Sequence, residues 1–318
     1  MKAIVYEQYG GPEQMMLREI ERPNPGPKEV LVKILAASVN KADWHLLTGE
    51  PFPIRMMAGM FRPKYKTLGA DVVGVVERVG AEVSQFKVGD EVFGELSATG
   101  FGGFAEYVTT DESHLARKPS NLTYEETAAL PMAAVTALQG LRSKGGIRKD
   151  QKVLINGASG GVGGFAIQIA KYFDAEVTAV CSTSKVELAW NQGADRILDY
   201  KEFDFTEGKS RYDLIFDVVG NHSIRAISGV LKDGGTYVSC AFSMGALFLG
   251  PWLSLANGKK FTNLMASTTS ADLQTISKMA EEGFIKPVIQ QIFTLDDVPE
   301  ALGVIGDGSA EGKLVISI

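Results

Sequence analysis

Residues 152–173 read KVLINGASGGVGGFAIQIAKYF, and their glycines crowd a turn between an apolar strand pattern and a helical pattern. Such a turn lets the backbone approach a pyrophosphate, while the following helix offers free N–H groups and its positive dipole end. The match to G-x-G-x-x-G is imperfect, because Ala158 occupies the first glycine position. Glycines also serve tight strand–helix packing, but the strand and helix flanking this turn favour a dinucleotide site. We expect the cofactor to bind Ala158, Ser159, Gly160, Gly161, Val162 and Gly163.

The end of the next apolar run, AVCSTSKVE, indicates which dinucleotide binds. NAD sites usually carry Asp or Glu about 20 residues after the turn to bind the ribose 2′-OH. Here Cys181 and Ser182 stand at that position. Hydroxyls and an ammonium, from Ser182, Ser184 and Lys185, would instead give a 2′-phosphate charge-assisted hydrogen bonds worth about 1.5–3 kcal/mol each. These residues could also simply cap the next helix. We predict NADPH, preferred over NADH by at least about a hundredfold.

A carboxylate inside an apolar, strand-like run raises the question of a metal. Asp71 lies in KYKTLGADVVGVVERVG, and a buried carboxylate needs a charge partner, several hydrogen bonds or a metal. A catalytic zinc usually takes three protein ligands from His, Cys, Asp or Glu. The chain has only 3 histidines and 2 cysteines, and they are scattered, so the metal interpretation is weak.

Two patterns of elements must position these residues. Residues 1 to about 120 read as short strands between Gly and Pro clusters, with few helices. From Leu122 the pattern changes to a helix, with Thr123 as N-cap and Glu126 completing a capping box. Five apolar strands alternating with helices follow, which predicts a parallel sheet covered on both faces. After a further helix, the tail from Pro287 reads again as strands and turns.

Composition excludes several classes of protein. With 318 residues, 45% hydrophobic and 22% charged, the chain is typical of a soluble globular protein. A net charge of -6 argues against a dominant nucleic-acid surface. No apolar run is long enough to span a membrane or to serve as a secretory signal. We expect a cytoplasmic protein with no nucleic-acid or membrane partner.

The motifs ASVNKADW, LGADVVGVVERVG, KVGDEVFG, GGFAEYV, AALPMAAVTALQGL, NGASGGVG and EGKLVISI follow one another along nearly the whole chain. Together they resemble the medium-chain dehydrogenase/reductase superfamily, in its zinc-free quinone oxidoreductase branch. The resemblance implies an α/β protein with a GroES-like β-rich catalytic domain and a Rossmann-type, doubly wound parallel-sheet cofactor domain. We place the catalytic domain at residues 1–121, completed by 287–318, and the cofactor domain at 122–286. A homodimer is implied by the family.

By the same resemblance, the three catalytic zinc-ligand positions of zinc alcohol dehydrogenases are here Asn40, Ala70 and Met132. We therefore predict no metal, and we expect Asp71 to be a hydrogen-bonded structural residue. Asn40 is implied to lie in the active site and to contact the cofactor. His45 stands near a position where relatives carry Tyr or a proton-relay His. It could donate a proton to the substrate or only shape the pocket.

The resemblance also supplies the remaining cofactor residues. We expect all of them at carboxyl ends of parallel strands, where doubly wound sheets bind ligands. They are Thr136, Tyr200, Val219, Gly220, Phe242 and Ser243.

The function implied is NADPH-dependent hydride transfer to a small apolar quinone or to an α,β-unsaturated carbonyl compound. Two alternatives stay open at this point. One is a zinc-free alcohol dehydrogenase-like oxidoreductase, and the other is a non-catalytic NADPH-binding protein. Turnover with a panel of acceptors would separate them.

Overall fold

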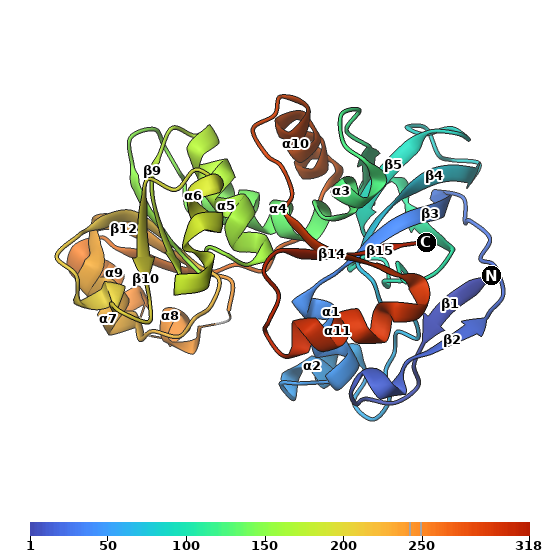
Figure 1. Cartoon of the computed structure of the whole chain (residues 1–318), viewed down its shortest axis with the longest axis horizontal. Helices are drawn as coiled ribbons and strands as arrows, with labels where there is room; N and C mark the ends of the chain where they lie inside the picture. Colours follow the sequence, from blue (N-terminus) through green and yellow to red (C-terminus); the bar gives the residue numbers. More distant parts are fainter. Residues whose placement is uncertain (242, 249) are drawn as a thin grey trace. The chain divides into compact units, whose positions relative to one another are not determined.

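The computed structural model describes residues 1–241, 243–248 and 250–318, without the side chains of 248, 253 and 255–257 (Figure 1). The chain forms two compact units. Unit 1 comprises residues 1–132 and 267–318, and unit 2 comprises residues 133–266. The α/β fold class predicted from the sequence is confirmed, since unit 1 is β-rich and unit 2 carries a parallel sheet.

Unit 1 is built on a seven-stranded sheet in the order β14-β15-β3-β4-β5-β7, with β6 paired to β3. All neighbours in this sheet are antiparallel except β14 and β15. A separate antiparallel pair is formed by β1 (Lys2–Val5) and β2 (Met16–Glu19). The strands of the large sheet are β3 (Glu29–Val39), β4 (Asp71–Val79), β5 (Glu91–Glu95), β6 (Tyr107–Asp111), β7 (Leu115–Arg117), β14 (Ile289–Thr294) and β15 (Lys313–Ser317).

The C-terminal segment completes this sheet, because β15 pairs with β3 in the register Leu314↔Val39. Between β14 and β15 the structure has a helix, α11 (Val298–Gly306), where strands and turns were predicted. That prediction was wrong. The apolar side chains of Val298, Ala301 and Leu302 follow helical spacing and pack into the core of unit 1. The other helices of unit 1 are α1 (Lys41–Thr48), α2 (Pro53–Ala58), α3 (Tyr124–Ala128) and α10 (Ser270–Glu281).

The predicted helix after Leu122 is divided in two. The capping box of Thr123 and Glu126 is present and starts α3, but Pro131 starts a second helix, α4 (Pro131–Leu138). A proline removes a helical N–H donor and clashes with the preceding turn, which favours the interruption of the helix there. A π-helical segment, Gln139–Lys144, follows α4.

Unit 2 contains a six-stranded, entirely parallel sheet in the order β10-β9-β8-β11-β12-β13. Its strands are β8 (Lys152–Asn156), β9 (Glu176–Cys181), β10 (Arg196–Asp199), β11 (Tyr212–Asp217), β12 (Leu231–Ser239) and β13 (Lys260–Asn263). The sequence predicted the first five, and missed β13 because its four residues alternate polar and apolar only briefly. The helices are α5 (Gly161–Tyr172), α6 (Val186–Asn191), α7 (Ile224–Val230), α8 (Met244–Phe248) and α9 (Gly250–Asn257).

The division into units differs from the predicted boundaries at 121/122 and 286/287, both of which fall inside unit 1. Helix α10, expected in the cofactor domain, makes hydrogen bonds to unit 1 instead. Ser270 Oγ donates to the Leu115 oxygen, and Ser277 Oγ donates to the Arg117 oxygen. Helical periodicity alone does not tell which sheet a helix will cover.

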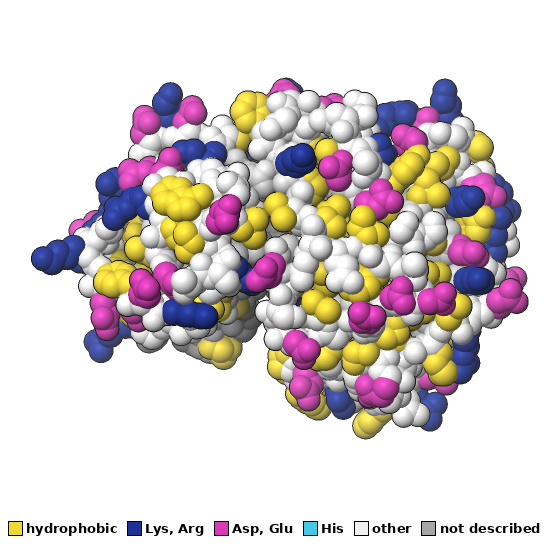
Figure 2. All heavy atoms as spheres, viewed as in Figure 1, with side chains coloured by type: hydrophobic (Ala, Val, Ile, Leu, Met, Phe, Trp, Pro, Cys, Tyr) yellow, Lys and Arg dark blue, Asp and Glu magenta, His cyan; other side chains and the backbone are white. Residues whose placement is uncertain are grey.

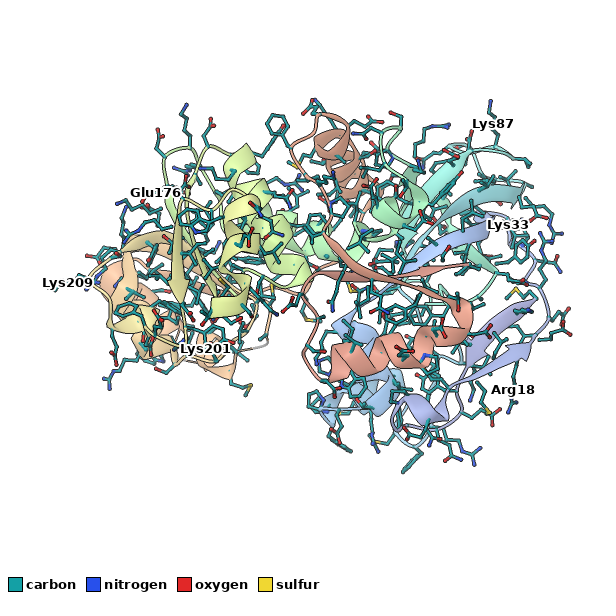
Figure 3. All side chains as sticks on the ribbon, in the orientation of Figure 1. Arg18, Lys33, Lys87, Glu176, Lys201 and Lys209 are labelled. Atoms are coloured by element: carbon teal, nitrogen blue, oxygen red, sulfur yellow. The ribbon has the colours of Figure 1, made fainter. Side chains whose placement is uncertain are left out.

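The surface carries charges of both signs. Figure 2 shows Lys and Arg side chains interspersed with Asp and Glu over the face that it draws. Charged side chains such as Lys33, Lys87 and Lys201 lie at the periphery (Figure 3). Within the described ranges, no helix has the length and apolar character needed to cross a bilayer.

Candidate functional site

The glycine turn of unit 2 begins directly after β8. The backbone N–H groups of Gly157 and Ala158 donate to the Val180 oxygen on β9, at 3.2 and 3.0 Å, and so hold the turn against the sheet. The turn then delivers the chain to α5, whose N-cap is Gly160. Since glycine has no side chain to cap the first N–H groups of the helix, these stay available to an anion.

Two glycines of this turn have different roles. A Cβ on Gly160 would have only the Gly157 oxygen nearby, at 3.7 Å, so the space above this residue is open. A Cβ on Gly163 would lie 2.1 Å from the Gly157 oxygen and 2.7 Å from Ala158 Cα. Gly163 therefore allows the helix to pack against the turn, and Gly160 leaves a cradle over the backbone. This is the geometry that a pyrophosphate requires.

The predicted cofactor residues of unit 2 gather at one edge of its sheet. The ends of the strands are in register, as shown by the pairs Asn156↔Asp217 and Cys181↔Asp199. The residues that follow these ends are the glycine turn, Ser182, Ser184, Lys185, Tyr200, Val219, Gly220 and Ser243. Thr136 belongs to helix α4 and does not follow a strand end as expected, and Phe242 lies outside the described residues.

The end of β9 carries the hydroxyls expected there, and a carboxylate that the sequence reasoning missed. Ser182 is buried, and its Oγ lies 3.4 Å from Ser184 Oγ. Asp199 ends β10 beside Cys181. The Thr183 side chain hydrogen-bonds to Asp199 and, with the Lys201 N–H at 2.9 Å, lowers the pKa of this carboxyl. A negative charge thus stands one strand away from the proposed phosphate-binding residues.

A second missed residue organises the loop after β11. Asp217 is fully buried, and its Oδ1 accepts hydrogen bonds from the N–H groups of Val219 and Gly220 at 3.0 and 2.8 Å. Asn156 Nδ2 and Tyr237 Oη donate to the same carboxylate, both at 2.9 Å. The carboxylate therefore fixes the predicted Val219–Gly220 contact loop. An aspartate ending a buried strand was the available sequence signal.

In unit 1, Asp71 is the centre of a buried hydrogen-bond network, as expected. Its Oδ1 accepts from the Met132 N–H at 2.8 Å. Its Oδ2 accepts from Ser38 Oγ at 2.7 Å and from Asn40 Nδ2 at 2.9 Å. The ammonium of Lys313 lies 3.4 Å from the same oxygen. This carboxylate has the charge partner and the hydrogen bonds that its burial demands.

Asn40 is engaged on both sides of its amide. Besides the bond to Asp71, Nδ2 lies 3.4 Å from the Ser38 oxygen. The Oδ1 atom accepts from Lys313 Nζ at 2.7 Å. Lys313 lies 273 positions further along the chain, and the sequence reasoning did not identify it.

Two more buried carboxyl groups border the network. Asp43 accepts from the N–H groups of Asn40 and Gly69, at 2.9 and 3.0 Å. Burial raises the pKa of Asp43 to about 7, although these two hydrogen bonds act in the opposite direction. Burial also raises the pKa of Glu95, which pairs with Asp71 across the β4–β5 ladder. Burial lowers the pKa of Lys313, opposed by Asp71 and Asp43.

His45 is half-buried on α1, and its ring is held at one nitrogen. Nδ1 lies 2.7 Å from the Glu50 oxygen. A carbonyl oxygen can only accept, so Nδ1 must carry the hydrogen. In the neutral ring Nε2 then has a lone pair and no proton.

The residues at the three positions that the resemblance aligns with zinc ligands all lie next to Asp71. Asn40 binds Asp71 through its side chain, Met132 through its backbone, and Ala70 precedes it. In the part of the chain that the structure describes, no group of three His, Cys, Asp or Glu side chains could hold a metal ion.

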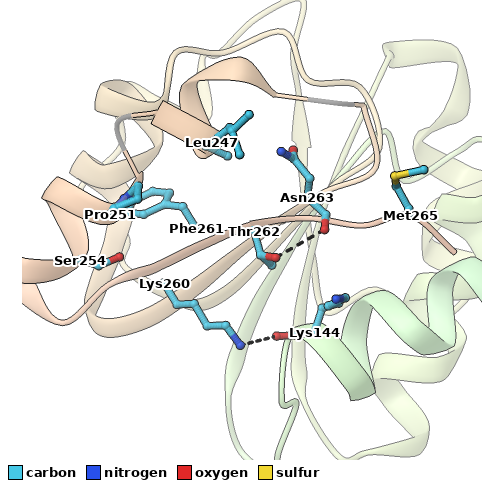
Figure 4. Close-up of a pocket in the computed structure, with 10 residues that line it drawn as sticks. Lys144, Leu247, Pro251, Ser254, Lys260, Phe261, Thr262, Asn263 and Met265 are labelled. Carbon is cyan, nitrogen blue, oxygen red and sulfur yellow. Dashed lines mark hydrogen bonds between the residues drawn. The ribbon is translucent and has the colours of Figure 1, made fainter. Parts of the chain in front are cut away.

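Unit 2 also has a pocket of about 570 Å³, shown in Figure 4. Its described lining comes from the π-helical segment, α8, α9, β13 and the residues after β13, and includes Lys144 and Lys260. Among the described residues, none of the predicted site residues lines this pocket directly, but the Ser243 N–H donates to Oδ1 of the lining residue Asn263 at 2.8 Å.

Comparison with known proteins agrees with this architecture. Residues 26–120 match the family described as "Alcohol dehydrogenase GroES-like domain", and residues 192–316 match "Zinc-binding dehydrogenase". The human mitochondrial NAD(P)H oxidoreductase RTN4IP1 is 34% identical over 362 residues, which cover 100% of this chain and 89% of the relative. The 2-methylene-furan-3-one reductase of Solanum lycopersicum is 34% identical over 327 residues, 99% of this chain and 79% of the relative.

A solved structure gives the same result. The quinone oxidoreductase from Coxiella burnetii superposes with a TM-score of 0.89 at 28% identity, over 100% of this chain and 99% of its own. The fold and the glycine turn are those of a two-domain oxidoreductase with a dinucleotide site. The chain belongs to the medium-chain dehydrogenase/reductase superfamily, in its quinone oxidoreductase-like branch.

Proposed function

We propose that this protein is a zinc-independent reductase that transfers hydride from NADPH to a quinone or an α,β-unsaturated carbonyl compound. The observation that carries the proposal is the open backbone at Gly160, at the carboxyl edge of a parallel sheet. The names of the relatives support the reaction class: one is an NAD(P)H oxidoreductase, one a quinone oxidoreductase, and one reduces a methylene-furanone, which is an enone.

The residues of unit 2 bind the cofactor. The first N–H groups of α5 hold the pyrophosphate, and Asp217 keeps the Val219–Gly220 loop in place. When bound, NADPH supplies a hydride from C4 of its nicotinamide. The chain's own task is to orient the acceptor and to stabilise the charge that develops on it.

The preference for NADPH rests on Ser182, Ser184 and Lys185 at the end of β9. They supply hydroxyls and an ammonium where NAD sites carry an acid on the same strand. The nearby Asp199 opposes a 2′-phosphate electrostatically. Its carboxylate already accepts two hydrogen bonds, one from the Thr183 side chain and one from the Lys201 backbone N–H.

Charge develops on the acceptor's carbonyl oxygen and needs a hydrogen-bond donor. Asn40 can provide one only by exchanging a bond it already makes. The 3.4 Å contact to the Ser38 oxygen is long and the easier to give up, while the 2.9 Å bond to Asp71 is of ordinary length. Asn40 thus supplies one N–H to the substrate and keeps the other on Asp71.

The same network supports the proposal of zinc independence. An amide, a methyl group and a thioether stand at the three former ligand positions, and none of them is a zinc ligand of the usual kind. The Lys313 ammonium, 2.7 Å from Asn40 Oδ1, would also repel a divalent cation there. Both observations weigh against the alcohol dehydrogenase alternative.

An acceptor screen tests the function. The purified protein is given NADPH or NADH with panels of quinones, enones, enals and simple aldehydes, before and after treatment with a strong chelator. We expect turnover of quinones or enones that is insensitive to the chelator, with kcat/KM for NADPH at least about a hundredfold above that for NADH. Chelator-sensitive reduction of simple aldehydes would favour the alcohol dehydrogenase alternative. NADPH binding without turnover of any acceptor would favour a non-catalytic protein.

A further inference from the structure

Lys313 is a buried lysine in the sheet of unit 1. It is the first residue of β15 and only 4% exposed. Lysine is almost never buried unless its charge is paired. Lys33, on the neighbouring strand β3, shows the usual behaviour and lies exposed at the periphery (Figure 3). The burial of Lys313 therefore requires specific partners.

Those partners match the chemistry of an ammonium group, which has three N–H donors and no acceptor. Nζ lies 2.7 Å from Asn40 Oδ1, 3.4 Å from Asp71 Oδ2 and 3.5 Å from the Val39 oxygen. The shortest contact goes to the neutral amide rather than to the carboxylate. Asn40 is thus the principal partner of the ammonium, and Asp71 supplies the balancing charge.

This contact fixes which way the Asn40 amide faces. Lys313 can only donate, so it must meet the amide oxygen. The Asp71 carboxylate can only accept, so it must meet the amide nitrogen. Only one orientation of the amide satisfies both neighbours. In the flipped amide, the N–H groups of the amide would face the Lys313 ammonium, and the amide oxygen would face the Asp71 carboxylate.

We propose that Lys313 is a positioning residue of the reductase, which acts through Asn40 and takes the organising place that a metal ion has in zinc-dependent relatives. Its ammonium binds Oδ1 of the amide, and the N–H groups of the same amide then face Asp71 and Ser38. A cation on the amide oxygen also strengthens the N–H groups of the same amide as donors, because linked hydrogen bonds polarise one another. The catalytic consequence rests on the function proposed above.

A double-mutant cycle tests whether Lys313 acts through Asn40. We expect Lys313→Met to lower kcat at least about tenfold, with KM for NADPH within about twofold, since the cofactor residues of unit 2 are untouched. In Asn40→Ala the amide is gone, so adding Lys313→Met should change kcat by no more than about twofold. Lys33→Met is the matched control and should keep wild-type kinetics. Losses that multiply in the double variant would overturn the proposal.

Lys313→Met leaves Asp71 charged in a buried site and could fail to fold. Lys313→Met combined with Asp71→Asn removes both charges, and we expect this double variant to lose kcat as Lys313→Met does. A double variant with kcat within about twofold of the wild type would contradict a positioning role.

The orientation itself is measurable in the wild-type protein without any acceptor. We expect the Lys313 ammonium to give an observable ¹⁵N-correlated NMR signal with a nuclear Overhauser contact to the Asn40 side-chain amide, whose hydrogens exchange slowly with water. An ammonium in rapid exchange, without that contact, would overturn the proposal. If the contact is present and no acceptor in the panel is reduced, the proposed function fails while the positioning of Asn40 stands.

Discussion

The Nδ1 atom of His45 lies 2.7 Å from the main-chain oxygen of Glu50, which assigns the ring hydrogen to that nitrogen. The other nitrogen, Nε2, can donate a proton only when the ring is positively charged. A role as proton donor is therefore restricted to the imidazolium form.

The first prediction concerns this histidine. His45→Phe should keep kcat on a good enone within about threefold of the wild type, because Nε2 of the neutral ring held at Nδ1 has no proton to donate. His114→Phe, elsewhere in unit 1, serves as the control for a lost ring. A drop of more than about tenfold would contradict this expectation and give the ring a part in the reaction.

The second prediction separates cofactor binding from folding within the glycine turn. Gly160→Ala places a methyl group in open space, so the free energy of unfolding should change by about 1 kcal/mol or less, while the Kd for NADPH rises at least about tenfold. Gly163→Ala places its methyl group 2.1 Å from the Gly157 oxygen and should destabilise the protein by about 1–3 kcal/mol. Urea unfolding and fluorescence titration with NADPH measure the two quantities. If folded Gly160→Ala bound NADPH with unchanged affinity, the pyrophosphate would not bind at this turn.

The third prediction concerns Asp199. The Thr183 hydroxyl lowers the pKa of this carboxyl, so it is negatively charged at neutral pH. Asp199→Asn should remove repulsion of the 2′-phosphate and raise the ratio of kcat/KM for NADPH over NADH by about threefold or more. Glu202→Gln, at an exposed position shortly after β10, controls for the loss of one negative charge. A fall of the ratio would show that Asp199 contributes to NADPH binding instead of opposing it.

The fourth prediction concerns Asp43 and pH. The folded protein holds the proton of this carboxyl up to about pH 7, whereas an unfolded chain releases it near about pH 4. The folded state therefore binds more protons in that window, and this group makes stability fall as pH rises through it. The free energy of unfolding of the wild type, relative to Asp43→Asn, should decline by up to about 1.4 kcal/mol per pH unit between about pH 4 and 7.

Asp111→Asn provides the control with the opposite sign. The Ser113 hydroxyl lowers the pKa of Asp111, so its contribution is complete above the pKa of the unfolded chain and is lost at lower pH. The difference between the wild type and Asp111→Asn should stay constant between about pH 5 and 7. A constant difference for Asp43→Asn over the same range would show that Asp43 is ionised throughout.

The parallel sheet and its glycine turn were predictable from sequence because their signals are local. Strand, turn and helix follow one another within residues 152–173, and the register of parallel strands then brings the other strand ends to the same edge. Local signals were present near α11 too, since Thr294 and Asp297 form a capping box on the short 3-10 turn just before it and Pro299 lies in the first turn of α11. These signals were not recognised in the sequence.

The network around Asp71 could not be predicted in the same way. Lys313 reaches Asn40 only because β15 pairs with β3, and that pairing joins the two ends of the chain. In a short strand such as KLVIS, a leading lysine is ordinarily read as exposed. Asp199 was not predicted as a site residue for a related reason. Its proximity to Cys181 depends on the register of β9 against β10.

Deuterium transfer tests the central claim most directly. NADPH carrying deuterium at each C4 position in turn is incubated with the protein and an enone, and the saturated product is analysed by mass spectrometry. An enone is required, because a hydride delivered to a quinone oxygen would exchange with water. We predict that one of the two labelled forms places deuterium on the β-carbon of the product, with or without a chelator. Product without deuterium from either form, or transfer that stops when metal is removed, would contradict metal-independent hydride transfer.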